Sequence, residues 1–181
     1  MSDKIKIIGS GLCGPLLAIL LAKKGNIVDL YEKNSDPRIK NNHSGRSINL
    51  ALSHRGIKAL KRAEVFHKIK PHLIPMKGRM IHHTNNNLEF QPYSTNSNDS
   101  INSISRNILN IELIHEAIKT GNVSINFKND LLEISEQELT FSSLGNVKNE
   151  GIVIGADGTG SKIREYINFK ENTSTTVEQL G

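Results

Sequence analysis

A glycine-rich turn near the N-terminus constrains this chain more than any other feature. The apolar residues 5–8 predict a short strand, and the segment Gly9-Ser10-Gly11-Leu12-Cys13-Gly14 follows it directly. In a dinucleotide-binding unit the first glycine makes a tight turn, and the second lets the backbone approach a pyrophosphate. The third lets the next helix pack close to the strand. The N-terminus of that helix offers free N–H groups and a positive dipole end to phosphates.

An acidic residue after the next predicted strand completes this pattern. Residues 27–31 predict the strand, and Glu32 follows it. A carboxylate at that position can accept hydrogen bonds from ribose hydroxyls. We therefore predict that Gly9, Gly11, Gly14 and Glu32 bind a dinucleotide. The alternative is a plain glycine-rich turn in another α/β unit, and it leaves Glu32 unexplained.

Charge and composition narrow the class of ligand. The chain has 181 residues, a net charge of +5 and a pI of about 9.3, which favours anionic ligands such as pyrophosphate or NADPH. Nucleic acid is disfavoured because the basic residues are scattered and aromatic residues make up only 4% of the chain. No secretory signal fits, and the apolar stretch 16–22 is too short to span a bilayer. We expect a cytoplasmic location and no membrane segment in this chain.

Cys13 is the only cysteine, so an internal disulfide and any multi-cysteine metal site are excluded. Its place at a helix N-terminus would favour a thiolate. We prefer the simpler interpretation of a small residue packed under the glycine turn. His82 and His83 are neighbours on a predicted strand, so they point to opposite faces and do not form a metal site.

Hydrophobic periodicity and turn residues divide the chain into alternating helices and strands of the α/β class. The predicted helices cover residues 12–24, 53–63, 64–70, 106–119 and 161–169. The predicted strands cover residues 4–8, 27–31, 77–82, 88–91, 123–127, 131–135, 138–142 and 151–154. Residues 46–52 are expected to be extended or irregular, and residues 33–45 and 94–100 to be loops. The strands within residues 79–91 look like part of a second sheet with too few strands to close.

Further motifs lie beyond the opening turn. They are Gly-Arg-Ser-Ile-Asn-Leu-Ala-Leu-Ser-His-Arg-Gly at 45–56, Ile-Pro-Met-Lys-Gly-Arg-Met-Ile-His at 74–82, Gln-Pro-Tyr at 91–93, Ile-Ser-Arg at 104–106 and Ala-Asp-Gly-Thr-Gly-Ser-Lys-Ile-Arg at 156–164. Together they closely resemble the kynurenine 3-monooxygenase family, flavoprotein aromatic hydroxylases of the para-hydroxybenzoate hydroxylase type. The resemblance covers residues 4–181. The opening turn and the Asp-Gly motif are common to that superfamily, whereas the 45–56 block, Arg79 and Tyr93 are more specific.

The resemblance implies a Rossmann-like FAD-binding domain of the GR2 type over residues 1–181, with residues 72–104 contributing strands to a substrate-binding sheet. The later Gly-Asp motif, the rest of that sheet and a C-terminal helical region of such enzymes have no counterpart in this sequence. We therefore interpret the chain as the N-terminal portion of a longer protein, with an incomplete FAD-binding domain.

The resemblance also extends the predicted FAD site beyond the four residues above. The added positions are Cys13, Tyr31, Lys33, Asn34, Arg46, Ala51, Arg106, Leu131 and Asp157. For Arg106 the alternative is a solvated residue in the first turn of a helix. A cation is mildly unfavourable there, which favours a functional role.

The family's substrate-carboxylate ligands match Arg79 and Tyr93. A guanidinium can hold the carboxylate of kynurenine in bidentate fashion, and a tyrosine hydroxyl can add one hydrogen bond. Without the resemblance, both residues would more simply be surface residues. No side chain is expected to act as a nucleophile, because the cofactor performs the chemistry in such enzymes.

The implied activity is an FAD-dependent, NADPH-using monooxygenase that hydroxylates L-kynurenine with dioxygen to 3-hydroxykynurenine. This reaction belongs to tryptophan degradation by the kynurenine pathway, towards quinolinate and NAD. Two alternatives remain open: a truncated, non-catalytic nucleotide-binding module, and another FAD-dependent oxidoreductase. We expect the chain alone to be inactive, and its sequence does not indicate an oligomeric state.

Overall fold

The structure is a computed structural model that describes residues 4–39, 48–96 and 99–176. The chain divides into two compact units. The first unit combines Met1–His43 with Leu113–Gly181, and the second unit is Ser44–Glu112. The long helix α4 (Arg106–Lys119) begins in the second unit and ends in the first.

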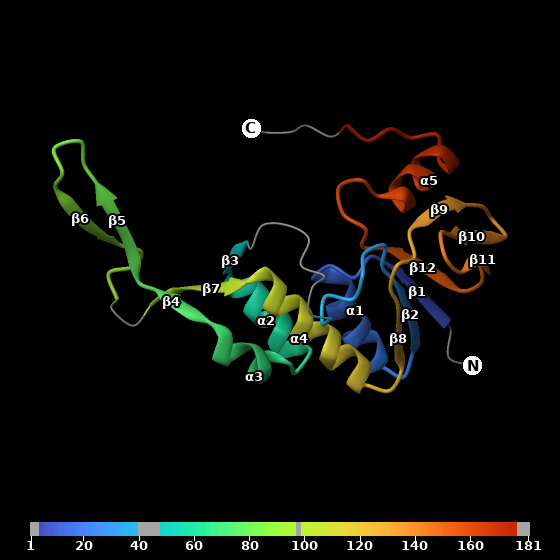
Figure 1. The fold of residues 1–181 in the computed structure, drawn as a ribbon, viewed down its shortest axis with the longest axis horizontal. Coiled ribbons are helices and arrows are strands. Elements are labelled where there is room, and N and C mark those ends of the chain that lie inside the picture. Colours follow the sequence, from blue (N-terminus) through green and yellow to red (C-terminus); the bar gives the residue numbers. More distant parts are fainter. Residues whose placement is uncertain (1–3, 40–47, 97–98, 177–181) are drawn as a thin grey trace. The chain divides into compact units, whose positions relative to one another are not determined.

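A parallel four-stranded sheet forms the centre of the first unit (Figure 1), which confirms the predicted α/β class. The strand order is β12 (Ile152–Gly155), β1 (Lys4–Ile8), β2 (Ile27–Tyr31) and β8 (Val123–Asn126). The helix α1 (Cys13–Ala22) connects β1 to β2 and packs against both. Its apolar sequence suits this position, since Ala18 and Ile19 are at most 1% exposed.

A smaller antiparallel sheet and the helix α5 (Lys162–Lys170) complete the first unit. The sheet consists of β9 (Leu131–Ile134), β10 (Glu138–Phe141) and β11 (Gly145–Lys148). The sequence predicted the first two strands as a hairpin but not β11. A buried cluster joins this sheet to the ends of β1 and β2 and to α5: Ile8, Tyr31, Leu131, Leu139, Phe141 and Ile163.

The second unit contains a three-stranded antiparallel sheet in the order β3 (Asn49–Leu52), β7 (Ile101–Ser105) and β4 (Ile74–Met76). The sequence left β3 undecided between an extended and an irregular segment, and it did not predict β4 or β7. The helices α2 (His54–Arg62) and α3 (Phe66–Ile69), followed by the 3-10 turn η1 (Lys70–His72), lie between β3 and β4 in the chain. Ser53 caps α2, because its side chain accepts the Gly56 N–H.

A two-stranded ribbon extends from this unit (Figure 1). It is formed by β5 (Gly78–His82) and β6 (Leu88–Pro92), both close to the predicted ranges. The expected substrate segment, residues 72–104, lies wholly within the second unit. Its part in a substrate-binding sheet stays a prediction.

Within the described residues, no helix has the length and apolar character needed to cross a membrane. The same residues hold no group of three or more His, Cys, Asp and Glu side chains arranged for a metal ion.

Candidate functional site

The glycine-rich turn between β1 and α1 packs so tightly that two of its glycines have no room for a side chain. Gly9 has a φ of +102°, and a Cβ there would collide with the Ala156 carbonyl. A Cβ on Gly14 would collide with the Gly9 carbonyl oxygen. Gly11 differs, because apart from its own chain neighbours no described atom lies within 4 Å of where its Cβ would be. The protein itself therefore does not require glycine at position 11, whereas close approach of a ligand would.

The N-terminus of α1 lies beside this open space and carries no side-chain cap. Leu12 at the N-cap position makes no side-chain hydrogen bond, and the first turn contains no acidic residue. The unpaired N–H groups are therefore available to an anion. Cys13 is exposed at the first helical position, so it does not pack under the turn as we had preferred. The Ser10 hydroxyl is buried and has no partner among the described residues.

Glu32 connects the end of β2 to this turn. Its Oε2 accepts the Ser10 N–H at 2.7 Å, and its Oε1 accepts the Asn34 N–H at 2.9 Å and the Asn34 side-chain amide at 2.7 Å. The N–H of Gly9, which follows β1, donates to the carbonyl of Tyr31, the last residue of β2, at 2.7 Å. The carboxylate is thus fixed next to the glycine-rich turn, with Lys33 and Asn34 exposed beside it.

Asp157 lies on the other side of the same turn. The Ala156 N–H donates to the Ile8 carbonyl at 2.7 Å, which extends the β12–β1 pairing up to the turn. A Cβ on Gly9 would also meet the Asp157 Cα. The Asp157 carboxylate accepts the Ile163 N–H at 3.4 Å, and Ser161 caps α5 by accepting the Arg164 N–H. The structure therefore brings Gly9, Glu32 and Asp157 together at one turn, and their part in FAD binding stays a prediction.

Tyr31 and Leu131 are buried below this site. Tyr31 is 4% exposed, and its ring stacks on Phe141 with centroids 4.3 Å apart. Burial, together with the charge of Asp29, raises the pKa of Tyr31 to about 12. Leu131 is 3% exposed in the same cluster. Their side chains therefore lie in the core below the turn, and their part in FAD binding stays a prediction.

The remaining predicted FAD residues do not belong to the first unit. Arg46 lies outside the described residues. Ala51 lies on β3, and Arg106 is the exposed first residue of α4, where its N–H donates to the Ile48 carbonyl at 2.9 Å. Both belong to the second unit, so their part in the site stays a prediction.

Arg79 and Tyr93 lie on one face of the β5–β6 ribbon. Arg79 pairs with Gln91 across the strands, and its Nε donates to the Gln91 Oε1 at 2.6 Å. Tyr93 lies two residues after Gln91 and extends the pairing through its N–H to the Lys77 carbonyl, so both side chains share a face. The opposite face carries exposed apolar residues: Met80, Leu88 and Phe90. The predicted carboxylate ligands are therefore neighbours on the polar face.

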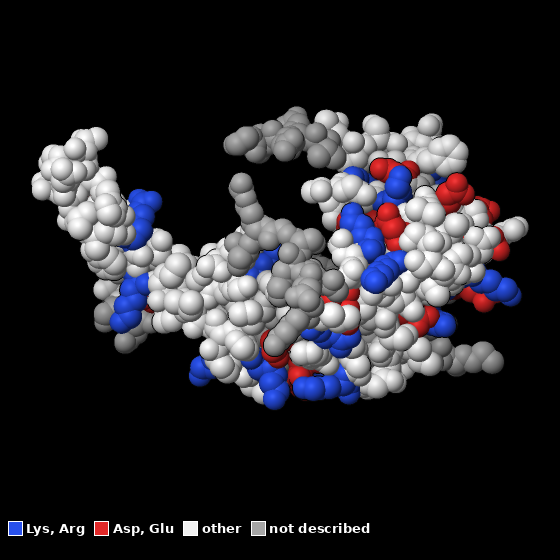
Figure 2. All heavy atoms as spheres, viewed as in Figure 1, with Lys and Arg blue, Asp and Glu red and all other residues white. Residues whose placement is uncertain are grey.

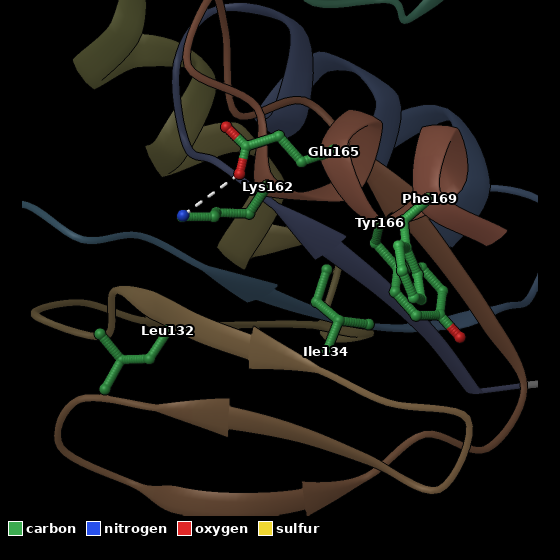
Figure 3. Close-up of a pocket in the computed structure, with 6 residues that line it drawn as sticks. All are labelled: Leu132, Ile134, Lys162, Glu165, Tyr166 and Phe169. Atoms are coloured by element: carbon green, nitrogen blue, oxygen red, sulfur yellow. Dashed lines mark hydrogen bonds and ion pairs between the residues drawn. The ribbon is translucent and has the colours of Figure 1, made fainter. Parts of the chain in front are cut away.

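The structure also has a shallow pocket that the sequence did not indicate (Figure 3). It has a volume of about 220 Å³ and lies between β9 and α5. Its lining residues are Leu132, Ile134, Lys162, Glu165, Tyr166 and Phe169. The Lys162 ammonium and the Glu165 carboxylate form an ion pair at 3.2 Å at one end. No predicted site residue lines this pocket.

On the face of the described residues that Figure 2 shows, basic side chains do not gather into one patch. On the face shown in Figure 2, Lys and Arg side chains are interspersed with Asp and Glu. The net positive charge therefore gives no separate signal for an extended polyanion.

A match to a family model shows which protein family this chain belongs to. The model of a family described as FAD binding domain matches residues 3–181. The chain belongs to the FAD-binding domain family. The predicted Rossmann-like α/β fold and the resemblance to kynurenine 3-monooxygenases are both confirmed.

Two curated relatives of this chain are named kynurenine 3-monooxygenase. The chain is 38% identical over 185 residues to the kynurenine 3-monooxygenase of Myxococcus xanthus, covering 99% of this chain and 40% of that protein. It is 40% identical over 188 residues to that of Cytophaga hutchinsonii, covering 99% and 41%. The chain thus spans about two fifths of the length of these relatives.

Two solved structures illustrate the similarity in fold. The tetrameric form of 2-methyl-3-hydroxypyridine-5-carboxylic acid oxygenase has a TM-score of 0.73 and 22% identity, covering 92% of this chain and 42% of that one. PqsL of P. aeruginosa in complex with 2-aminobenzoylacetate has a TM-score of 0.73 and 15% identity, covering 99% and 48%. These likenesses establish the fold of the FAD-binding domain.

Proposed function

We propose that this chain binds FAD and forms the FAD-binding part of a kynurenine 3-monooxygenase. The proposed enzyme uses NADPH and dioxygen to convert L-kynurenine to 3-hydroxykynurenine in tryptophan degradation, in the cytoplasm. The observation that carries the proposal is the identity of 36–40% to proteins of that name over 90% or more of this chain. The glycine-rich turn with Glu32 supports the FAD part independently.

The residues at this turn fit a dinucleotide. The open space at Gly11 admits a pyrophosphate, and the uncapped N-terminus of α1 supplies N–H donors for it. Glu32 uses three hydrogen bonds within the chain, and a carboxylate can accept about four, so it retains capacity for a ribose hydroxyl. The free N–H donors of α1 suit a phosphate, and the remaining acceptor position of Glu32 suits a ribose hydroxyl beside it.

Bound FAD, reduced by NADPH, would supply the reaction with dioxygen. The chain's own residues bind and orient it. The α1 N-terminus holds the pyrophosphate, Glu32 holds the ribose, and Lys33, Asn34 and Cys13 lie exposed where they can line the site. Arg46, Ala51, Arg106 and Asp157 complete the proposed set of FAD ligands.

Arg79 and Tyr93 are the proposed ligands of the substrate carboxylate. Their shared face on the β5–β6 ribbon allows the guanidinium and the phenol to meet one carboxylate. The Arg79 Nε donates to the Gln91 Oε1, so the two terminal nitrogens of the guanidinium remain for the substrate carboxylate.

Two measurements test the proposal. FAD titrated into the purified chain should bind saturably, as followed by flavin fluorescence, and absence of binding would contradict the cofactor assignment. The chain with FAD, NADPH and L-kynurenine should give no 3-hydroxykynurenine by chromatography, because it spans only about two fifths of its relatives.

Sequencing beyond codon 181 distinguishes the alternatives. If the reading frame continues, the longer polypeptide should form 3-hydroxykynurenine. FAD binding without product in that polypeptide would instead support a non-catalytic nucleotide-binding module.

A further inference from the structure

The connection between β8 and β9 lies directly behind Glu32. The Asn129 N–H donates to the Glu32 carbonyl at 2.8 Å, and the Lys128 N–H donates to the Asn34 carbonyl at 3.0 Å. Lys128 has a φ of 59°, and this left-handed conformation turns the chain between the two donors. Both carbonyls that flank Lys33 are thus held by one turn. The position of the Glu32 backbone therefore depends on the position of this turn.

The side chain of Asn129 holds the turn in place. Asn129 is 7% exposed. Its Nδ2 donates to the Phe127 carbonyl at 2.9 Å, and its Oδ1 accepts the Leu144 N–H at 3.0 Å. Leu144 lies between β10 and β11, so this one side chain ties the end of β8 to the neighbouring sheet. An amide suits the site because it offers a donor and an acceptor at once.

Two serines from the β10–β11 connection reinforce the same turn. The Ser143 hydroxyl donates to the Lys128 carbonyl at 2.7 Å, and the Ser142 hydroxyl donates to it at 3.4 Å. The turn is therefore held on one side by the small sheet, and it holds Glu32 and Asn34 on the other. Glu32 in turn accepts the Ser10 N–H of the glycine-rich turn.

We propose that Asn129 is a positioning residue for the adenosine end of FAD, acting through Glu32. The inference rests on the proposed FAD binding and extends it to a residue outside the predicted ligand set. Asn129 keeps the carboxylate in a fixed place before the ligand arrives, so less ordering is needed on binding. Replacing it with alanine leaves the Phe127 carbonyl and the Leu144 N–H without these partners, which frees the turn to shift.

The test compares ADP with 2′,3′-dideoxy-ADP, titrated into the 181-residue chain by calorimetry. The preference for ADP reports the contact between Glu32 and the ribose hydroxyls. We expect the unaltered chain to prefer ADP roughly tenfold, the scale for a hydrogen bond to a charged group. In Asn129→Ala the preference should fall below about threefold, because the turn that holds the Glu32 backbone is free to shift and moves the carboxylate away from the ribose.

The matched control is Asn149→Ala. The Asn149 Nδ2 donates to the Ser135 carbonyl at 2.7 Å, at the end of the small sheet away from Glu32. This variant should keep the full preference for ADP. A merely structural loss would weaken both nucleotides equally and leave the preference unchanged, and that result in Asn129→Ala would overturn the proposal.

Ser143→Ala tests the same idea if Asn129→Ala does not fold. It removes a donor to the Lys128 carbonyl from an exposed residue, and the preference for ADP should fall by about twofold. An unchanged preference in Ser143→Ala would then count against the positioning role. If the unaltered chain bound neither ADP nor FAD, the proposed function would fail together with this inference. Binding with an unaltered preference in the variants would defeat the inference alone.

Discussion

The Glu32 carboxylate fixes the glycine-rich turn to the end of β2, because its Oε2 accepts the Ser10 N–H at 2.7 Å. The same carboxylate is the predicted ribose ligand. Glu32 therefore has one structural role, seen in its hydrogen bonds within the chain, and one predicted role in ligand binding. Substitution should affect the shape of the turn as well as the contact with the ligand.

Glu32→Gln should weaken FAD binding by about 1–3 kcal/mol, the scale for hydrogen bonds to a charged group. The new amide places a donor against either the Ser10 N–H or the Asn34 donors. The measurement is flavin fluorescence titration of both chains. Glu133→Gln, at an exposed residue of β9, is the control and should leave the affinity unchanged. Equal FAD affinity in Glu32→Gln would remove Glu32 from the site.

Gly11 and Gly14 should respond differently to alanine. Gly14→Ala should lower the thermal unfolding midpoint, because the new Cβ collides with the Gly9 carbonyl oxygen. Gly11→Ala should fold with an unchanged midpoint, since no described atom lies near its Cβ. It should nevertheless lower FAD affinity by at least about tenfold, if the pyrophosphate approaches the backbone there. Unchanged FAD affinity in a folded Gly11→Ala chain would contradict this role for Gly11.

The sequence predicted the parts of the fold whose signals are local. β1 and β2 are apolar runs beside the glycine-rich turn, and α1 begins directly after it. β7 was not predicted, because Asn102 and Ser103 are poor strand formers. In the structure, hydrogen bonding of β7 to β3 and β4 overrides that local preference. β4 was not predicted either, because it contains Pro75, and proline normally argues against a strand.

The sequence predicted which residues belong to the candidate site, but not the hydrogen bonds between them. The acid at the end of β2 follows from spacing along the chain. Its bond to the Ser10 N–H does not, because it requires the strand end and the turn to meet in space. Asn129 gave no signal at all in the sequence. Its importance follows from its burial and from the two backbone groups that its amide joins.

Tyr31 should make the stability of the first unit depend on alkaline pH. Burial raises its pKa to about 12 in the folded chain, from the ordinary value of 10.0. The folded state therefore retains the phenol proton longer than the unfolded state. This contribution is fully present below pH 10 and is lost as the pH rises towards 12.

Comparison of the chain with Tyr31→Phe isolates this contribution from the titration of lysines. Denaturant unfolding at pH 8 and pH 11 should show a larger loss of stability in the unaltered chain, by about 1–2 kcal/mol. Phenylalanine retains the stacking on Phe141. The same pH dependence in both chains would show that Tyr31 ionises normally in the folded state.

Arg79→Lys should raise the KM for L-kynurenine in the proposed full-length enzyme by roughly tenfold or more, because a point charge replaces a bidentate fork. Lysine also lacks the Nε that donates to the Gln91 Oε1, so its ammonium is no longer held on the face that carries Tyr93. Flavin reduction by NADPH in the absence of substrate should change little, since Arg79 is not a proposed FAD ligand. Arg62→Lys, an exposed change in the last turn of α2, is the matched control and should leave KM unaltered. The measurement is steady-state formation of 3-hydroxykynurenine at varied substrate concentration, together with stopped-flow flavin reduction. An Arg79→Lys enzyme with the same dependence on kynurenine as Arg62→Lys would exclude Arg79 from carboxylate recognition.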